Sequence, residues 1–264
     1  MKTGFIGYGN MASAIAGGMI RQGVYEAGDI IVSAGNFEKL KQKSKGTGVD
    51  IREDNLSVAR DADILFLGVK PFLIVDIIRE IKDAVKDDAI IISIALGVSL
   101  EEMTEAFGRP MKLVRAMPNT PARVGEGMTI YNSTDELSLQ EEAAVLDLFT
   151  SFGIAQRVQD SQFPGAGSLT GCSPAFIYML MEAMADGAVH QGVPRDQAYR
   201  LAAQTVKGAA EMLLSTGLHP GELKDQVTSP GGTTIEGVRY LEQVAFRSAI
   251  MEAIIKASEK TKGN

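Results

Sequence analysis

Residues Gly7 to Ala12 have the spacing Gly-x-Gly-x-x-Ala, which can bind the pyrophosphate of a dinucleotide. A strand-like run precedes them and an Ala- and Met-rich helical pattern follows. In that setting Gly7 permits a tight turn, Gly9 lets the backbone approach the anion, and Ala12 lets the helix pack on the strand. The start of the helix then offers free N–H groups to the anion. An ordinary strand-to-helix turn is the alternative, but the position and order of the motif favour a dinucleotide site.

The end of the next strand-like run indicates which dinucleotide is bound. NAD sites usually have an Asp or Glu about twenty residues past the glycines, where it holds the ribose 2′-hydroxyl. Residues 32–36 read Val-Ser-Ala-Gly-Asn, without a carboxylate, and Lys39 follows. A 2′-phosphate would meet a hydroxyl, an amide and this ammonium, so NADP(H) is predicted as the cofactor, with NAD(H) as a possible second. The rest of the lysine run at 39–45 is interpreted as a solvated helix face.

A second glycine cluster, residues 229–236, reads Ser-Pro-Gly-Gly-Thr-Thr-Ile-Glu. Pro-Gly-Gly breaks the preceding helix, and Thr233 with Glu236 predicts a capping box for the next one. A cap needs only one residue, whereas this loop adds two glycines and leaves the hydroxyl of Thr234 free in the first turn. Backbone N–H groups at such a helix start can bind a carboxylate. The loop is therefore either a plain cap or a carboxylate site.

Two further segments belong to the groove of the first motif, because ligands of parallel sheets lie outside the carboxyl ends of the strands. Lys70 follows one apolar run and would point over the cleft, with Pro71 opening a helix behind it. Residues 94–97, Ile-Ala-Leu-Gly, end the next run. A plain surface lysine is an equally good interpretation of Lys70.

The elements that must position these residues form two groups. Short apolar runs alternate with helical patterns in the first part, which is typical of a parallel sheet with crossover helices. Ser99 with Glu102 predicts one capping box, and Gly153 is expected to close a helix over 136–152. The strands are expected at 3–7, 30–33, 63–69, 89–94, 111–115 and 128–131. From about residue 163 the pattern is helical only, with helices expected at 173–191, 194–216, 234–241 and 245–260.

The fold class is therefore α/β, with an N-terminal Rossmann-type doubly wound sheet followed by an all-helical C-terminal domain. The predicted domains are 1–160 for dinucleotide binding and 161–264 for oligomerisation and substrate binding. The apolar faces of the later helices exceed what one small helical core would bury, which predicts a homo-oligomer.

Composition excludes several other classes. The chain has 26 basic and 33 acidic residues, a net charge of −7, so a nucleic-acid partner is not expected. One cysteine and two histidines exclude a disulfide framework and argue against a metal site, and they favour the reducing cytoplasm. No stretch is long and apolar enough to predict a membrane span. The count of 28 glycines is high, and the two anion sites account for part of it.

Four segments together resemble the pyrroline-5-carboxylate reductase family. They are the signature-like stretch 223–237, GFIGYGNMA at 4–12, LGVKP at 67–71 and MPNTP at 117–121. The resemblance runs from residue 2 to about residue 260. It implies the NAD(P)H-dependent reduction of 1-pyrroline-5-carboxylate to L-proline, the last step of proline biosynthesis. It also implies dimers, or rings of dimers, whose helical domains interlock.

The resemblance also implies the site residues. The residues expected at the cofactor are Ile6, Gly7, Tyr8, Gly9, Asn10, Met11, Ser33, Asn36, Asn55, Val69, Lys70, Pro71, Ala95 and Leu96. The residues expected at the substrate are Gln226, Ser229, Gly232, Thr233, Thr234 and, more weakly, Asp160. Because an iminium carbon accepts hydride directly, the protein has mostly to position the reactants. Thr234 is the catalytic candidate, hydrogen-bonded to the ring nitrogen and relaying its proton.

The chain departs from the family pattern at two places. Gly171-Cys172-Ser173 stands where Gly-Ser-Gly is common, and Gln226 stands where many members have Asn. Cys172 is either a helix N-terminal thiolate or, more simply, a small packed residue. Two other functions compete with the reductase. A β-hydroxyacid dehydrogenase would need Lys and Asn where Ala175 and Met179 stand, and a non-catalytic nucleotide sensor would not need the 229–236 loop.

Overall fold

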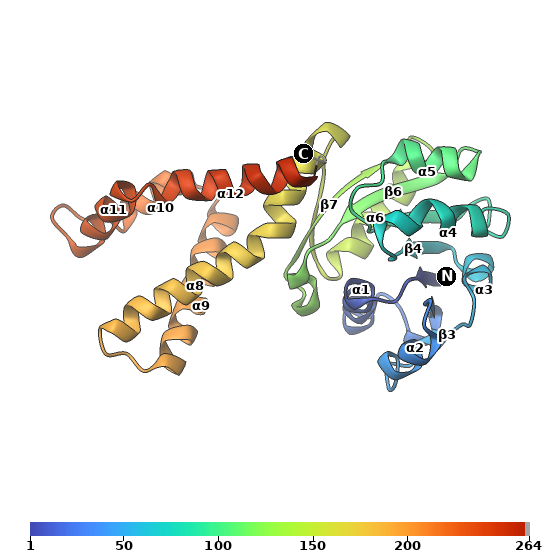
Figure 1. Ribbon diagram of the computed structural model, residues 1–264, viewed down its shortest axis with the longest axis horizontal. Helices are drawn as coiled ribbons and strands as arrows, with labels where there is room; N and C mark the ends of the chain where they lie inside the picture. Colours follow the sequence, from blue (N-terminus) through green and yellow to red (C-terminus); the bar gives the residue numbers. More distant parts are fainter. Residues whose placement is uncertain (262–264) are drawn as a thin grey trace. The chain divides into compact units, whose positions relative to one another are not determined.

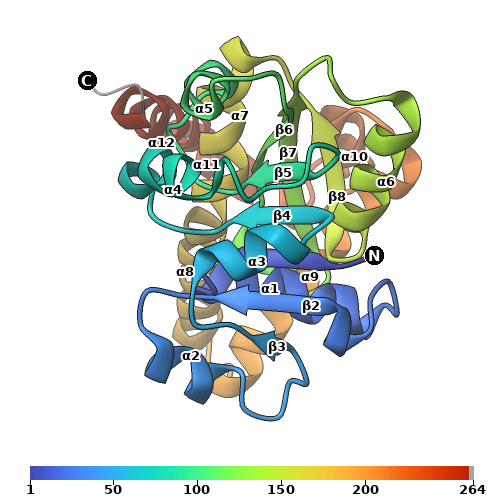
Figure 2. The ribbon, with the colours of Figure 1, turned by 90° about the vertical axis from the view of Figure 1, so that its right-hand side faces the viewer.

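The computed structural model describes residues 1–261, which form two compact units, Met1–Gly171 and the segment from Cys172 onward (Figure 1). The first unit is built on a sheet whose described strands lie side by side in the order β3-β2-β1-β4-β5-β6-β7-β8 (Figure 2). All neighbouring strands are parallel except β6 and β7. The strands are β1 (Thr3–Ile6), β2 (Ile30–Ser33), β3 (Asp50–Ile51), β4 (Ile64–Leu67), β5 (Ile90–Ser93), β6 (Lys112–Met117), β7 (Gly127–Ser133) and β8 (Gly153–Arg157).

Helices cover both faces of this sheet. Side chains of α1 (Asn10–Arg21), α2 (Phe37–Lys43) and α6 (Leu139–Thr150) pack into one core with alternate strand residues such as Phe66. Side chains of α3 (Asn55–Asp61), α4 (Ile74–Ile81) and α5 (Leu100–Phe107) pack into a second core with the intervening residues, such as Leu65 and Leu67. Burial on both faces explains why the central strands read as continuous apolar runs. The expected doubly wound sheet is confirmed.

Most predicted elements of this unit are present, and the capping box of α5 is confirmed. Ser99 Oγ accepts from the Glu102 N–H, and the Glu102 carboxylate accepts from the Ser99 N–H. The expected helix over 136–152 is shorter, because Ser138 and Glu141 form a second capping box that starts α6 at residue 139. The prediction that Gly153 closes this helix is wrong, since α6 ends at Thr150 and Gly153 opens β8.

Residues 160–171 belong to the first unit. They contain α7 (Phe163–Gly167), followed by a π-helical turn, Ser168–Cys172. Phe163 is buried, and Asn119 Nδ2 donates to the Thr170 carbonyl oxygen at 2.9 Å. The compact first unit therefore extends to Gly171, past the expected boundary at residue 160.

The second unit consists of helices in its described part. α8 and α9 pack against each other as a helical hairpin (Figure 1), and α11 contacts α12. Within residues 172–261 the buried apolar side chains are the small ones of Ala185, Ala198 and Ala202. The helices are α8 (Ser173–His190), α9 (Arg195–Thr216), α10 (Pro220–Gln226), α11 (Thr233–Gln243) and α12 (Phe246–Thr261).

Large apolar side chains of the second unit are exposed instead. Those more than a third exposed are Ile177, Tyr178, Met179, Met184, Tyr199, Leu201, Met212, Leu213, Leu214, Val227, Tyr240, Leu241, Val244, Ile250, Met251 and Ile255. Over its described length this unit has no large-residue core of its own, although no helix in residues 1–261 is long and apolar enough to cross a bilayer.

Candidate functional site

The strand register brings the predicted cofactor residues of the first unit to one edge of the sheet. Ile6 at the end of β1 pairs with Ser33 at the end of β2 and with Leu67 at the end of β4. Leu67 pairs in turn with Ser93 of β5. The loops after these four strands therefore start side by side. The strand order reverses its direction between β1 and β4, which is the point where ligands bind in open α/β sheets.

Two glycines let the backbone segments that follow β1 and β4 approach each other closely at this switch point. Gly7 has φ +90°, and a Cβ on it would lie 2.7 Å from the carbonyl carbon of Gly68. A Cβ on Gly68 would lie 2.6 Å from the Gly7 carbonyl oxygen. The Gly7 N–H donates to the Ser33 carbonyl oxygen and the Gly68 N–H to that of Ile6. Both positions thus require glycine because of the protein's own packing.

Gly9 is different. It is the N-cap of α1, and no described side chain caps this helix. An added Cβ on Gly9 would have no atom of the described chain within 4 Å. Packing within the described protein therefore does not require glycine here. A Cβ would instead fill the space through which an anion reaches the N–H groups at the start of α1, so the loop fits a dinucleotide pyrophosphate.

The residues expected at the ribose are held by hydrogen bonds within the protein. Ser33 is buried, and its hydroxyl donates to Asn55 Oδ1 at 2.8 Å. Asn55 Nδ2 donates to the Glu80 carboxylate at 3.1 Å, which fixes the orientation of the amide. Asn36 Oδ1 accepts from the Lys39 N–H at 2.9 Å and so caps α2. Two of the three side chains with which the sequence would hold a 2′-phosphate, Ser33 and Asn36, therefore already serve the fold.

The remaining cofactor candidates follow β4 and β5. Val69 lies beside Gly7, and Lys70 is the exposed N-cap of the turn Pro71–Leu73 that leads into α4. Pro71 takes the first position of that turn, as predicted. After β5, Ala95 is buried, whereas Leu96 is exposed.

A cation that sequence reasoning missed lies next to the glycine loop. Lys43, the last residue of α2, donates from Nζ to Asn10 Oδ1 at 3.1 Å and lies 6.0 Å from the centre of the Tyr8 ring. Burial and the nearby charge of Arg123 lower the pKa of Lys43. Lys43 is exposed, as expected of a solvated face, but its ammonium is also hydrogen-bonded to the glycine loop. This contact can be recognised only in the folded protein, where α2 packs next to the loop.

The substrate candidates of the second unit surround the turn between α10 and α11. The Gly232 N–H donates to the Ser229 carbonyl oxygen at 3.0 Å, and Gly231 has φ +69°. With Pro230 second and glycine third, this is a type II turn. Gln226 is the last residue of α10, and two residues separate it from this turn, after which α11 starts.

The predicted capping box of Thr233 and Glu236 is wrong. Gly232 takes the N-cap position, Thr233 is the first helical residue, and no described side chain caps α11. The Glu236 carboxylate pairs with Arg239 instead. The N–H groups in the first turn are therefore free of a side-chain cap, and Thr233 and Thr234 are exposed beside them. Such an arrangement suits a carboxylate ligand.

Asp160 belongs to the first unit and has a cationic partner there. Its Oδ1 lies 3.5 Å from Arg115 Nη1, and the Arg115 guanidinium lies 4.1 Å from the centre of the Phe163 ring. Burial lowers the pKa of Arg115, whereas the charge of Asp160 acts in the opposite direction. The contact ties the 160–163 segment to β6.

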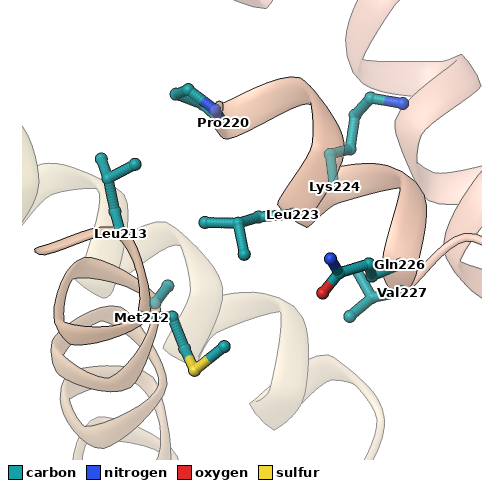
Figure 3. Close-up of a pocket in the computed structure, with 8 residues that line it drawn as sticks. Met212, Leu213, Pro220, Leu223, Lys224, Gln226 and Val227 are labelled. Atoms are coloured by element: carbon teal, nitrogen blue, oxygen red, sulfur yellow. The ribbon is translucent and has the colours of Figure 1, made fainter. Parts of the chain in front are cut away.

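An apolar pocket of about 420 Å³ lies between α9 and α10. Figure 3 shows Leu223 of α10 pointing towards Met212 and Leu213 of α9, and Lys224 pointing away from them. Gln226 borders the pocket at its α10 end (Figure 3). This lining suits apolar side chains better than a small charged metabolite.

A doubly wound sheet with a glycine-lined switch point defines the dinucleotide-binding class of oxidoreductase folds. Residues 2–97 match the family model described as NADP oxidoreductase, coenzyme F420-dependent, and residues 160–264 match pyrroline-5-carboxylate reductase dimerisation. A pyrroline-5-carboxylate reductase of Escherichia coli is 44% identical over 260 residues, covering 98% of this chain and 97% of the relative. The chain belongs to the pyrroline-5-carboxylate reductase family.

Solved structures agree with this assignment. A pyrroline-5-carboxylate reductase of Coxiella burnetii has a TM-score of 0.91 and 33% identity over 99% of this chain and 97% of that one. A pyrroline carboxylate reductase of Plasmodium falciparum, solved with NADP bound, has a TM-score of 0.89 and 32% identity over 100% and 97%. The family expected from the sequence is confirmed, and the β-hydroxyacid dehydrogenase alternative is wrong.

Proposed function

We propose that this protein reduces 1-pyrroline-5-carboxylate to L-proline with NADPH. Family membership supports the reaction, and the observation that carries the substrate assignment is the uncapped start of α11 after the Ser-Pro-Gly-Gly turn. Free N–H groups and the helix dipole at that position can hold the carboxylate of a small imino acid. The nearest alternative is a sensor that binds the dinucleotide without catalysis.

The cofactor would be held at the carboxyl edge of the sheet. The N–H groups at the start of α1, around Gly9, would bind its pyrophosphate, and Asn55 would contact its adenosine half. Val69, Lys70, Ala95 and Leu96 follow the two strands on the other side of the switch point, where they would border its nicotinamide half. NADPH supplies the hydride.

The substrate would be held by the second unit. The N–H groups of Thr233 and Thr234 would bind its carboxylate, with Ser229 and Gly232 shaping the turn. The Thr234 hydroxyl would hydrogen-bond the ring nitrogen and pass a proton between it and solvent. The Gln226 amide would supply a further hydrogen bond, and Asp160 is a weaker candidate because it already pairs with Arg115.

Thr234→Ala is expected to lower kcat/KM for the imine about tenfold, the value of one neutral hydrogen bond of about 1.4 kcal/mol. Thr234→Ser keeps the hydroxyl and should retain most of the activity. The loss of NADPH absorbance at saturating cofactor measures both. Thr205→Ala, which removes an exposed hydroxyl bonded within α9, is the control. Full activity of Thr234→Ala would rule out its role, and a wild-type protein that binds NADPH without turnover would favour the sensor.

We further infer that the functional unit is a homodimer, or a ring of dimers, joined through the helical units. The exposed apolar side chains of α8 to α12 support this, because they leave the second unit without a large-residue core in its described part. The match of residues 160–264 to a dimerisation model supports it too. The assignment to the cytoplasm stays a prediction from cysteine usage.

Leu213→Arg is expected to shift the assembly towards monomers, because it places a charge among the apolar side chains of α9 and α10. Light scattering coupled to size exclusion measures the mass at several protein concentrations. Leu139→Arg makes the same change at a side chain of the first unit that is 87% exposed, and its assembly should be unchanged. A wild-type chain that stays monomeric at micromolar concentration would contradict the inference.

A further inference from the structure

Lys43 lies beside the glycine loop of the predicted cofactor site. Helix α2 directly follows β2, and the ribose of a bound dinucleotide lies beyond the end of that strand in this fold. From the last position of α2 the Lys43 ammonium turns towards the glycine loop and donates to Asn10 Oδ1 at 3.1 Å. The ammonium of Lys43 therefore lies against the glycine loop, on the side of the loop that faces α2.

Lys43 differs from its neighbour on the same helix in having no counter-ion. Lys41 pairs with Glu38 at 3.2 Å, whereas none of the ion pairs found among residues 1–261 includes Lys43. Partial burial and, second, the charge of the nearby cation Arg123 lower the pKa of Lys43. Two neighbouring cations without a carboxylate form a locally positive site in a chain of net charge −7. An anion bound there would stabilise the protonated lysine.

The chemistry of the site favours the 2′-phosphate of the cofactor as that anion. The pyrophosphate already has the N–H groups around Gly9. Of the side chains that the sequence offers near the ribose, Ser33 donates to Asn55 and Asn36 uses its Oδ1 to cap α2. The Nδ2 donors of Asn36 and the exposed ammonium of Lys39 remain for the phosphate. A phosphate dianion carries two negative charges, so it gains from a second ammonium in addition to that of Lys39.

We propose that Lys43, assisted by the charge of Arg123, binds the 2′-phosphate of NADPH and sets the preference for NADPH over NADH. The proposal rests on the proposed function only in that the protein binds a dinucleotide. It does not depend on which imine is reduced, or on whether reduction occurs.

The test is the equilibrium affinity of each variant for the two reduced cofactors, followed by nicotinamide fluorescence without any imine present. The chain has no tryptophan, so protein emission does not interfere. Lys43→Met keeps the length and removes the charge. It should weaken NADPH binding about tenfold and leave NADH binding within about twofold, since one partly exposed charged contact is lost. Lys43→Arg should restore the preference, and Lys41→Met should behave as wild type.

A second titration isolates the phosphate. Calorimetry with adenosine 2′,5′-bisphosphate and with AMP should show the loss in Lys43→Met for the bisphosphate only. An equal loss of NADPH and NADH would place Lys43 at the pyrophosphate or in the loop structure and overturn the proposal. Unchanged NADPH affinity would overturn it as well. A wild-type protein that binds neither dinucleotide would refute the proposed function and this inference together, whereas binding without imine turnover would refute only the former.

Discussion

A Gly9→Val chain is expected to fold like the wild type and to lose about a thousandfold in affinity for NADPH, about 4 kcal/mol. The fold should persist because the described protein has no atom within 4 Å of a Cβ at this position, and Gly9 does not have positive φ. Affinity should fall because the side chain would occupy the approach to the N–H groups of α1, which no described side chain caps. Gly7→Ala should behave differently, since its Cβ would meet the backbone of Gly68 and destabilise the fold itself.

Fluorescence titration with NADPH and thermal unfolding in its absence separate the two effects. Gly28→Val is the matched control, because Gly28 also has no atom of the described chain near an added Cβ but lies before β2, in the turn Ala27–Asp29. That variant should bind NADPH normally. Tight binding by Gly9→Val would contradict the assignment of this loop to the pyrophosphate.

Gly153→Ala is expected to lower the free energy of unfolding by more than about 3 kcal/mol, or to prevent soluble expression. Gly153 has φ +151°, and its added Cβ would overlap the Gly127 carbonyl oxygen and lie 2.5 Å from the Gly127 nitrogen. These two residues are the first pair between β7 and β8. A Cβ on Gly127 would in turn lie 2.7 Å from the Phe152 carbonyl oxygen, so the two backbones approach closely at this residue too.

Urea unfolding measures the loss. Gly165→Ala in α7 is the control, because no described atom lies within 4 Å of its added Cβ, and it should be neutral or slightly stabilising. A Gly153→Ala chain within about 1 kcal/mol of wild type would mean that β8 can be displaced from β7 at little cost.

The central sheet could be predicted from the sequence because its strands are buried on both faces and read as apolar runs. β3 and β8 were missed for opposite reasons. Residues 50–51 are too short to show a pattern, and Gly153–Arg157 is a half-exposed edge strand with mixed composition. The cofactor loop was found because a strand, two spaced glycines and a helix constrain one another along the chain.

Local sequence patterns did not predict the features that depend on how the elements pack together. The Ser99 and Thr233 segments carry the same capping signal, but only Ser99 takes the N-cap position. At the second site Gly232 occupies that position with extended backbone after the type II turn, and the helix begins one residue earlier than a Thr233 cap would require. Lys43 gave no local signal either, because its partner Asn10 is 33 residues away along the chain. Side chains that reach across elements are visible only once the elements are packed.

In the inferred homodimer, folding of the helical unit is a bimolecular event. Its described helices bury three alanines and leave leucines, methionines and tyrosines for a second copy to cover. The free energy that holds these helices together then depends on protein concentration, and so does the melting temperature. A newly made chain can complete its sheet alone, because that unit has two full apolar cores. Residues 172–261 would be covered only when a second copy binds, and until then they are the part most exposed to proteases and to non-specific association.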